Sequence, residues 1–370
     1  MDLNELRDRI NDIDAQLLEL FEKRMDVCCN IAEYKLANDM KVFHPERERQ
    51  VVERIRKMAP DDLKSSAEVL FTNLMDISKC KQFQRFFSYA EPFVYEPFDL
   101  NGKYKVAVPG TVGSYSQAAA QKFLPALDIE FFDSFGEVFA AVESGSAEFG
   151  VAAIANSTAG TVSQTYELLR KYDFHISATT KIEINHCLAV RNDTDPAGIK
   201  RVFSHEQALM QCSEYLAEKG YSTRSYENTA LAAAFVKETN EPYAAICSEV
   251  CANELGLKII DRNIANAESN FTRFILFSKT AKRLEDADTI SVSLTLPHQT
   301  SALYRLLTKF SVAGLNLTKL ESRPIANTDF DVLFYLDFEG SVTSPEVVRL
   351  IRELKHELTY FKYLGNYKEI

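Results

Sequence analysis

Residues 270–277 read Asn270-Phe271-Thr272-Arg273-Phe274-Ile275-Leu276-Phe277, so a hydroxyl and a guanidinium stand among aromatic residues at the start of an apolar run. Such a run predicts a buried strand. Polar side chains at the entry of a buried strand on a sheet edge usually serve a ligand. On local pattern alone, an ordinary strand whose Thr272 and Arg273 are solvated is the commoner case, so both interpretations stay open here.

Short apolar runs on the N-terminal side of this stretch alternate with helix-like stretches. The expected strands are Tyr104–Val108, Ile129–Phe132, Phe149–Ile154, Arg201–Phe203 and Tyr243–Ile246. This alternation predicts an α/β sheet with helices on its faces.

Three of the expected strand-to-helix junctions carry small hydroxyl residues, at Gly110–Ser116, Asn156–Thr161 and Phe203–His205. Free N–H groups and the helix dipole attract anions at helix starts. Ordinary capping explains any one junction. Three junctions together with Thr272 and Arg273 indicate a pocket for a dicarboxylate.

Residues 103–280 resemble the prephenate dehydratases along their whole length. The resemblance rests on Gly113-Ser114-Tyr115-Ser116, Asn156-Ser157-Thr158-Ala159-Gly160, Ser204 with Gln211, and Thr272-Arg273-Phe274. It implies two α/β lobes with the site in the cleft, where prephenate loses carbon dioxide and hydroxide to give phenylpyruvate without metal or organic cofactor. It also implies that Thr272 assists the departing hydroxyl and that Asn156, Ser204 and Gln211 position the substrate. Ser114 and Arg273 complete the implied site.

The sequence departs from this family at two positions of the dehydratase region, Ala155 and Gln117, of which Gln117 replaces a frequent His. The family usually reads Pro-Ile-Glu-Asn, whereas this chain reads Ala153-Ile154-Ala155-Asn156. A missing carboxylate there would alter hydrogen bonding near the leaving group. Two alternatives follow: lobes that only bind an aromatic ligand and transmit regulation, or a dehydratase that acts on arogenate.

His186 and Cys187 do not form a catalytic pair, because adjacent strand residues point to opposite faces, so a packed histidine is expected.

The N-terminal segment has an uninterrupted helical pattern. Apolar residues recur at steps of three and four, without Gly or Pro before Pro45, which predicts one helix of some 35 residues. Pro45 suits the start of a second helix to about Met58, and Ser65 or Ser66 suits the cap of a third to about Phe87. The first helix, about 50 Å long, needs a partner along its length, most simply a second copy of itself.

Two cations interrupt the apolar face of the first helix. Arg24 and Lys35 are eleven residues apart and return to within about 20° of one face, so both point into the bundle. A buried anion site explains them; stems that snorkel to water are the alternative. Arg7 lies about 25 Å from Arg24 on another face and reaches that pocket only from another subunit. Ser78 and Gln82 share a face of the third helix.

The N-terminal segment resembles the all-helical chorismate mutases. The residues that carry the resemblance are Arg7, Arg24, Lys35, Arg47, Glu48, Ser78 and Gln82. It implies an interlocked homodimer that rearranges chorismate to prephenate. By the resemblance, the partner's Arg7 and this chain's Arg24 grip carboxylates, Lys35 and Gln82 donate to the ether oxygen, and Glu48 holds the ring hydroxyl. His44 replaces a usual Asp before Pro45, which predicts a weaker helix start.

The C-terminal segment has the pattern βαββαβ of a ferredoxin-like α+β module. The expected elements are strand Thr289–Leu296, helix Ser301–Val312, strands Asn316–Arg323 and Phe330–Phe338, helix Ser344–Glu357 and strand Tyr360–Tyr367. The motif Glu321-Ser322-Arg323-Pro324 resembles that of regulatory ACT domains, which implies feedback by L-phenylalanine bound at a subunit interface. Ser301-Ala302-Leu303 is a variant of a second motif, with a side chain in place of glycine. A structural dimerisation module is the alternative.

Composition and length agree with a multidomain chain. With 370 residues, 46% of them hydrophobic and 26% charged, it exceeds one core and has ordinary globular composition. We expect domains at 1–90, 103–280 and 288–370, with linkers at 91–102 and 282–288.

The N-terminus lacks a signal-like pattern, so a cytoplasmic protein without a membrane span is expected. Seven cysteines without zinc-type spacing predict reduced core thiols and no metal, and a net charge of -11 argues against nucleic acid.

Overall fold

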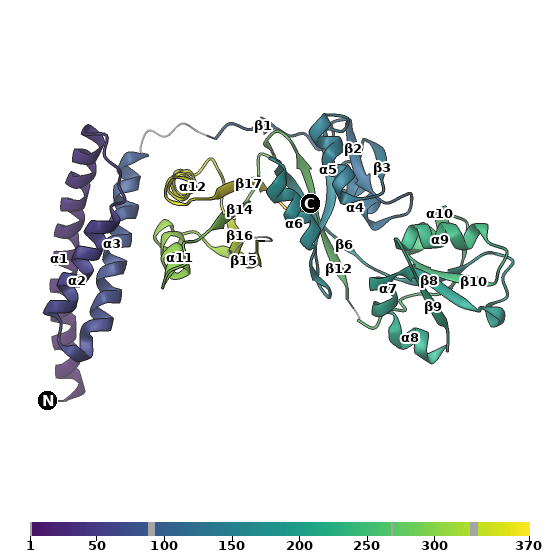
Figure 1. The fold of residues 1–370 in the computed structure, drawn as a ribbon, viewed down its shortest axis with the longest axis horizontal. Coiled ribbons are helices and arrows are strands. Elements are labelled where there is room, and N and C mark those ends of the chain that lie inside the picture. The colour runs from purple at the N-terminus through teal and green to yellow at the C-terminus, as the bar shows by residue number, and fades with distance from the viewer. Residues whose placement is uncertain (1, 88–92, 268, 326–331) are drawn as a thin grey trace. The chain divides into compact units, whose positions relative to one another are not determined.

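The computed structural model describes residues 2–87, 93–267, 269–325 and 332–370, and the chain divides into two compact units (Figure 1). One unit combines the N-terminal segment up to Phe93 with Thr289–Tyr363, and the other combines Val94–Asp288 with Leu364–Ile370. In the described residues no helix is long and apolar enough to cross a membrane. All seven cysteines are free, and six of them are buried.

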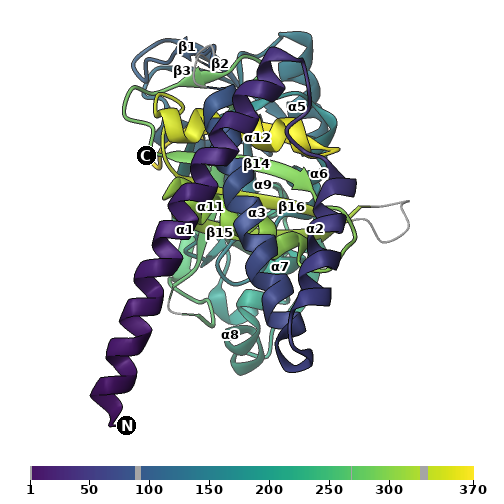
Figure 2. The ribbon, with the colours of Figure 1, turned by 90° about the vertical axis from the view of Figure 1, so that its left-hand side faces the viewer.

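Three helices form the N-terminal part of the first unit: α1 (Leu3–Ala37), α2 (Pro45–Met58) and α3 (Lys64–Phe86). The 35 residues of α1 confirm the length predicted from its periodicity. Asp2 starts it with a capping box, since the Asp2 side chain accepts the N–H of Glu5 and the Glu5 side chain accepts the N–H of Asp2. The N-terminal half of α1 extends past α2 and α3 (Figure 2).

The predicted caps of the third helix are wrong. A 3-10 turn at Asp61–Leu63 leads directly into α3, and Leu63 occupies the cap position without a side-chain hydrogen bond. Because the chain already has helical geometry at Lys64, Ser65 and Ser66 lie within the helix. His44 does cap α2, since its ring Nδ1 accepts the N–H of Arg47 at 3.3 Å. The imidazole therefore replaces the cap carboxylate whose loss was expected to weaken this helix start.

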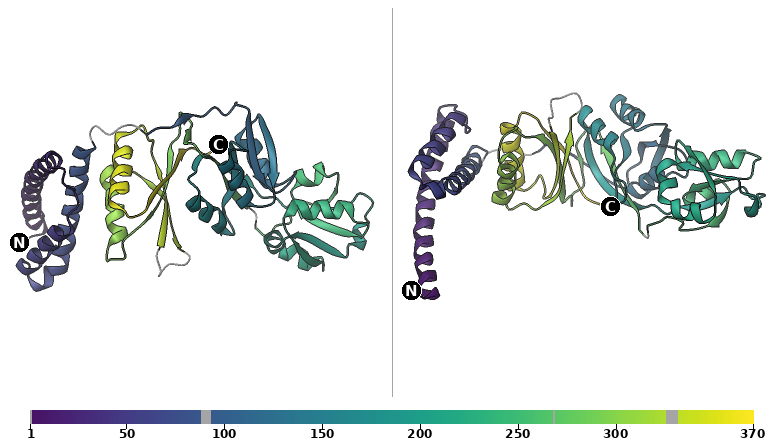
Figure 3. Two further views of the ribbon diagram at one scale, coloured as in Figure 1. Left: turned by 45° about the horizontal axis from the view of Figure 1, so that its top comes forward. Right: turned by 60° about the horizontal axis from the view of Figure 1, so that its bottom comes forward.

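The C-terminal part of the first unit has the predicted order of elements. These are β14 (Thr289–Thr295), α11 (Ala302–Ala313), β15 (Leu317–Pro324), β16 (Val332–Glu339), α12 (Pro345–Glu357) and β17 (Phe361–Tyr367). The sheet order is β15-β16-β14-β17, and α11 and α12 cover one face of it (Figure 3). Apolar residues of β14 and β16 pack against both helices. The first two residues of the predicted strand Phe330–Phe338 lie outside the described residues.

The second unit contains two lobes. The first lobe has β2 (Tyr104–Pro109), β3 (Leu127–Phe132), β4 (Phe149–Asn156), β5 (Gly160–Thr161), β6 (His175–Glu183) and β12 (Phe271–Ser278), with helices α4 (Tyr115–Phe123), α5 (Phe135–Ser144) and α6 (Ser163–Lys171). Its sheet order is β3-β2-β4-β12-β6, with β5 paired to β4. β12 therefore lies between two neighbours, and its expected position at a sheet edge is wrong.

The second lobe has its own sheet, in the order β11-β7-β10-β8-β9. Its strands are β7 (Cys187–Val190), β8 (Arg201–His205), β9 (Ser222–Tyr226), β10 (Tyr243–Cys247) and β11 (Lys258–Asp261). Its helices are α7 (Glu206–Gln211), α8 (Ser213–Glu218), α9 (Thr229–Glu238) and α10 (Glu249–Glu254), with a 3-10 turn at Pro196–Gly198. The chain enters this lobe after β6 and returns from it into β12.

The two segments expected to be linkers pair with each other. β1 (Glu96–Pro97) runs parallel to β13 (Lys282–Arg283), and Phe98 behind it is buried against the ring of Phe149. Burial of the Phe98 ring anchors this segment, although composition alone suggested a linker here. Parts of both predicted linkers are thus ordered as strands, while residues 91 and 92 lie outside the described part of the chain.

Candidate active sites

Side chains of α1 and α3 meet in the helical bundle. Arg24 donates from Nη1 to the Leu74 carbonyl at 2.9 Å and also to the Ser78 hydroxyl. Lys35 donates from Nζ to Oε1 of Gln82 at 3.2 Å. The structure thus brings together both cations that interrupt the apolar face of α1 and both polar residues of α3. Burial lowers the pKa of Lys35, and nearby Cys28 and Glu48 oppose this shift.

The remaining residues of the expected mutase site lie differently. Glu48 accepts from Lys79 Nζ at 2.9 Å and lies 3.1 Å from Nη2 of Arg305. Arg47 is exposed at the start of α2. Arg7 is exposed on α1 and stands about 25 Å along the helix from Arg24. Neither Lys79 nor Arg305 was predicted, although Lys79 directly follows Ser78 in the sequence.

A cavity of about 570 Å³ opens in the second unit, and both lobes line it. Of the residues expected in the dehydratase site, it is lined by Ser114, Asn156, Gln211 and Thr272. The cavity is lined by three residues that cap helices, namely Ser114 of α4, Ser134 of α5 and Asn228 of α9. Three helix starts thus converge on one cavity, and their N–H groups and dipoles favour an anion. Among the described lining residues there is no lysine or arginine.

A continuous chain of hydrogen bonds leads along the cavity to Thr272. Gln211 Nε2 donates to Thr158 Oγ1 at 3.0 Å, and Thr158 Oγ1 donates to Asn156 Oδ1 at 2.7 Å. Asn156 Nδ2 then donates to Thr272 Oγ1 at 2.9 Å. Because Thr272 accepts from Asn156, its own proton is free to point into the cavity.

His186 stands at the other end of this chain. Its Nε2 lies 3.0 Å from Oε1 of Gln211, and only 2% of the residue is exposed. Since the Gln211 amide donates to Thr158, its oxygen must accept, which requires the proton on Nε2. Burial lowers the pKa of His186, opposed by the Gln211 hydrogen bond. The packed histidine expected from the sequence is therefore confirmed, and Cys187 lies in the core of the second lobe.

The structure does not bring Ser204 and Arg273 into the cavity. Ser204 is fully buried and donates to the Ile246 carbonyl at 2.7 Å. Arg273 points to the opposite face of the sheet from Thr272 because side chains alternate along β12. Its guanidinium lies 3.5 Å from the carboxylate of Glu369, near the C-terminus. Neither of these two residues of the family motif therefore lines the cavity in this structure.

The departure at Ala155 also lies away from the cavity. Ala155 pairs with Arg273 across β4 and β12, whereas Thr272 pairs with Asn156. Directly paired residues project to the same face, so a side chain at 155 stands beside Arg273. A register shift follows in β4, which is why Ala153 and Asn156 line the cavity while Ala155 does not. The expected effect of the missing carboxylate on the leaving group therefore finds no support in the geometry.

The predicted helix start at Asn156–Thr161 is a hairpin instead. Asn156 Oδ1 accepts the N–H groups of Thr158 at 3.0 Å and Ala159 at 2.8 Å, and Gly160 takes a positive φ of 81°. This side-chain turn reverses the strand, and helix α6 begins only at Ser163. The same turn places the Thr158 hydroxyl between Asn156 and Gln211.

Sequence reasoning missed three titratable residues that line the cavity, namely Asp133, His205 and Glu227. Each stands at or directly after the C-terminal end of a parallel strand, β3, β8 or β9. Ligands bind at that edge in open α/β sheets. Polar residues at these strand ends were therefore the signal that could have found them. No group of three His, Cys, Asp or Glu residues that could hold a metal ion occurs in the described parts of the chain.

Comparison with known proteins matches both sites to families. The model of chorismate mutase type II matches residues 6–83, and that of prephenate dehydratase matches residues 106–282. The bifunctional chorismate mutase/prephenate dehydratase of Aquifex aeolicus is 30% identical over 373 residues, covering 99% of this chain and 98% of the relative. That of Escherichia coli K12 is 29% identical over 375 residues, with coverage of 98% and 95%.

Two solved structures are similar to about seven tenths of this chain. Prephenate dehydratase from Arthrobacter aurescens in complex with L-Phe aligns with a TM-score of 0.65 and 26% identity, covering 71% of this chain and 90% of that one. A protein described as GqqA, a quorum quenching acylase, aligns with a TM-score of 0.65 and 28% identity, covering 72% and 98%.

Proposed function

Because this chain belongs to the family of bifunctional chorismate mutase/prephenate dehydratases, we propose that it converts chorismate to prephenate and prephenate to phenylpyruvate at these two sites. The observation that carries this proposal is the similarity to bifunctional relatives over 98 to 99% of the chain, together with a polar site in each matched region. We assign the mutase to residues 1–90, the dehydratase to 103–280 and a regulatory module to 288–370.

In the mutase site, the protein binds and orients a dianion that rearranges without any proton transfer. Arg24 faces the substrate carboxylates, and Lys35 with Gln82 donates to the ether oxygen as its bond to carbon breaks. That oxygen gains negative charge in the transition state, which preorganised donors stabilise. Ser78 holds the Arg24 guanidinium, and Glu48 accepts from the ring hydroxyl. Arg47 at the start of α2 adds positive charge at the mouth of the site.

A second copy of the chain completes the mutase site. The N-terminal half of α1 exposes a row of apolar side chains: Ile10 at 58%, Ile13 at 53%, Leu17 at 56% and Leu20 at 62%. Such a row needs a partner helix, and a paired copy would carry its own Arg7 toward the Arg24 pocket of the first. Mixing inactive Arg7→Ala and Arg24→Ala chains should restore part of the mutase activity. No restoration after confirmed subunit exchange would contradict the shared site.

In the dehydratase site, the residues orient prephenate and stabilise the hydroxide that departs. The carbon–carbon bond to the ring carboxylate breaks, carbon dioxide leaves, and the electron pair aromatises the ring as the carbon–oxygen bond opens. Thr272, held by Asn156, donates its hydrogen bond to the departing oxygen. Gln211 and Ser114 position the substrate beside it, with the starts of α4, α5 and α9 facing its negative charge.

Turnover of prephenate tests this site directly. Purified protein with prephenate should produce phenylpyruvate, measured by absorbance in base, at a rate above the uncatalysed background. Absence of product would favour lobes that only bind a ligand. Parallel kinetics with arogenate decide which of the two substrates is preferred.

The C-terminal module has the strand order of a ferredoxin-like fold, and we assign it the regulatory role of an ACT domain that binds L-phenylalanine. Glu321, Ser322, Arg323 and Pro324 lie on β15, at an edge of its sheet. Ser301, Ala302 and Leu303 form the start of α11, where Ser301 has a positive φ of 65° that favours glycine. The L-Phe complex of the Arthrobacter aurescens relative supports this role.

Phenylalanine binding is measurable as thermal stabilisation. Free ligand at 100 times its dissociation constant stabilises a protein by about 2.7 kcal/mol. The melting temperature should therefore rise with phenylalanine, and both reactions should slow. A flat titration at millimolar concentrations would leave the module as a structural dimerisation element.

A further inference from the structure

Helix α11 of the C-terminal module delivers a guanidinium to the helical bundle. Arg305 makes a bidentate contact with Asp76 of α3, with Nε 3.0 Å from Oδ2 and Nη2 2.8 Å from Oδ1. The same Nη2 lies 3.1 Å from Oε2 of Glu48 on α2. Asp76 is 1% exposed, so its charge is compensated inside the protein. Arg305 therefore joins one buried structural carboxylate to one carboxylate of the mutase site.

Lys79 closes this cluster into a group of four charges. Its Nζ lies 2.9 Å from Oε1 of Glu48 and 2.8 Å from Oδ1 of Asp76. Each oxygen of Glu48 is thus fixed by one cation, Oε1 by Lys79 and Oε2 by Arg305. Burial lowers the pKa of Arg305, but the Asp76 and Glu48 carboxylates outweigh it and raise the pKa. Two cations thus balance the two carboxylates, and Glu48 lies within a cluster without excess charge.

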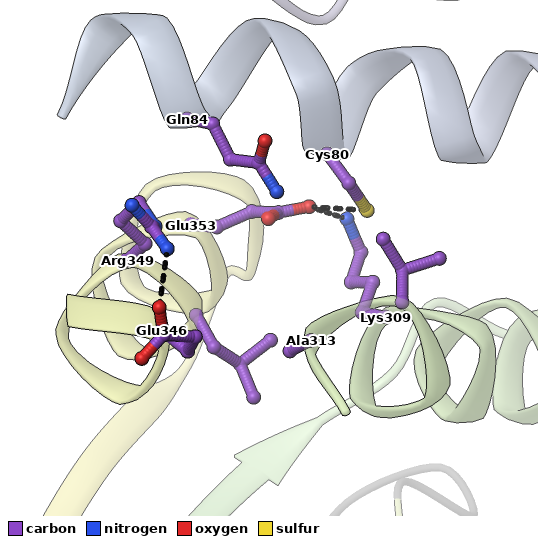
Figure 4. Close-up of a pocket in the computed structure, with 9 residues that line it drawn as sticks. Cys80, Gln84, Lys309, Ala313, Glu346, Arg349 and Glu353 are labelled. Carbon is purple, nitrogen blue, oxygen red and sulfur yellow. Dashed lines mark hydrogen bonds and ion pairs between the residues drawn. The ribbon is translucent and has the colours of Figure 1, made fainter. Parts of the chain in front are cut away.

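A second group of contacts, one helical turn further along, links both α11 and α3 to Glu353 of α12. Lys309 pairs with Glu353 of α12 and lies 2.8 Å from Glu357, and Cys80 lies 3.5 Å from the same Glu353 carboxylate. Figure 4 shows both side chains turned toward Glu353. Burial raises the pKa of Cys80 to about 12, so the thiol stays protonated and donates. Arg305 and Lys309 are four positions apart on α11, as Asp76 and Cys80 are on α3, so the two contacts repeat after one helical turn on each helix.

We propose that Arg305 is a positioning residue of the mutase site, supplied by the C-terminal module to hold the Glu48 carboxylate oriented toward the ring hydroxyl of chorismate. This inference rests on the role of Glu48 in the proposed function. A guanidinium suits the task because its planar fork grips Asp76 with one edge and still presents an N–H to Glu48. The mutase reaction consequently depends on a residue more than 200 positions away in the sequence.

Steady-state kinetics of chorismate rearrangement by the full chain test the proposal. Arg305→Ala should lower kcat/KM between about 10-fold and about 100-fold, as when a partner that orients a catalytic group is lost. Arg305→Lys keeps the charge beside Asp76 but loses the fork, so its kcat/KM should fall between wild type and alanine. Because the lysine variant preserves the charge that packs α11 on α3, it tests the proposal even where the alanine variant unfolds.

A double-mutant cycle separates positioning from a merely structural contact. In a Glu48→Gln background, Arg305→Ala should change kcat/KM by less than about twofold, because the group it orients is already gone. Arg349→Ala on α12 is the matched control, since Arg349 pairs with Glu346 of its own helix, and it should retain wild-type mutase activity.

Two outcomes would overturn the inference alone: Arg305→Ala with unchanged or raised kcat/KM, or an equal loss in both backgrounds. The proposed function fails separately if wild type shows no mutase activity or if Glu48→Gln remains fully active, and either result also removes the premise of the inference. Helical content, measured by circular dichroism, reports for each variant that the bundle is folded, and the dehydratase rate reports the same for the second unit.

Discussion

Thr272 ends a chain of oriented donors, and that orientation gives its hydroxyl a specific chemical task. Thr272→Val keeps the shape of the side chain and removes the hydrogen bond to the departing oxygen. We expect kcat for prephenate to fall about 100-fold to about 1,000-fold, as on loss of one donor to a developing oxyanion, with little change in KM. Steady-state kinetics measure this, and a loss of less than about threefold would show that another group performs the task.

Ala155→Glu is the matched control on the neighbouring strand. Restoring the family's carboxylate places it beside Arg273, on the face of the sheet away from the cavity. The new side chain should compete with Glu369 for the Arg273 guanidinium and leave the dehydratase kcat within about threefold of wild type. A large gain in rate would instead return position 155 to the chemistry of the leaving group.

His186 gives the dehydratase region a defined response to acid. Its pKa is lowered in the folded protein, chiefly by burial, so the unfolded chain takes up a proton more readily. This group therefore contributes stability above its unfolded pKa of about 6.5, and the contribution is lost as pH falls toward its folded pKa. His186→Gln keeps an N–H donor for Gln211 without a titrating ring.

Urea denaturation at pH 8 and at pH 5.5 measures this contribution of His186. Wild type should lose more free energy of unfolding between the two pH values than His186→Gln does. Equal losses in the two proteins would contradict the buried, neutral histidine.

At the scale of single elements, periodicity predicted helices well because it reports which face is buried. The 35-residue α1 and the start of α2 at Pro45 follow from spacing and from one proline. Local polar signals were less reliable, since a serine or asparagine satisfies N–H groups in turns as well as at helix caps. Asn156 thus formed a hairpin where a helix start was expected, and Ser65 lay inside α3.

The exposed apolar row on α1 supplies a test at this same scale. Leu17→Glu buries a charge wherever a second copy covers the row, so the proposed dimer should dissociate and mutase activity should fall with it. Gln16→Glu adds the same charge on an exposed neighbouring position and should leave both properties unchanged. Analytical ultracentrifugation and mutase kinetics report the two effects, and a Leu17→Glu chain that stays dimeric would exclude this face as the interface.

At the scale of the whole molecule, the order of domains along the chain does not give their packing. Motifs divided the chain into three segments, but no local pattern could show that Asp76 contacts Arg305, because 229 positions separate them. The same limit applies to Glu369, which pairs with Arg273 from the far end of the sequence. Single-sequence patterns report which residues are buried or charged, whereas the identity of a distant partner depends on the complete fold.

The contact between the C-terminal module and the mutase bundle makes a prediction about feedback. Ser301, Ala302 and Leu303 begin the same helix that carries Arg305 one turn later. If phenylalanine binds at this helix start as proposed, it can inhibit the mutase by favouring a state in which α11 holds Glu48 differently. Arg305→Ala should therefore abolish the remaining sensitivity of the mutase to phenylalanine, while the dehydratase of the same chain remains inhibited.

Inhibition curves for both reactions, measured on one preparation, decide this point. Arg349→Ala serves as control and should keep both responses, because its partner Glu346 lies on α12 and not on the bundle. Coupling between two binding sites is reciprocal. A non-reactive dicarboxylate analogue of the mutase transition state should therefore change the phenylalanine affinity of the wild-type protein. It should leave the phenylalanine affinity of Arg305→Ala unchanged. If the Arg305→Ala mutase remains as sensitive to phenylalanine as wild type, the signal reaches the bundle through contacts other than Arg305, with the Lys309 and Glu353 pair the next to test.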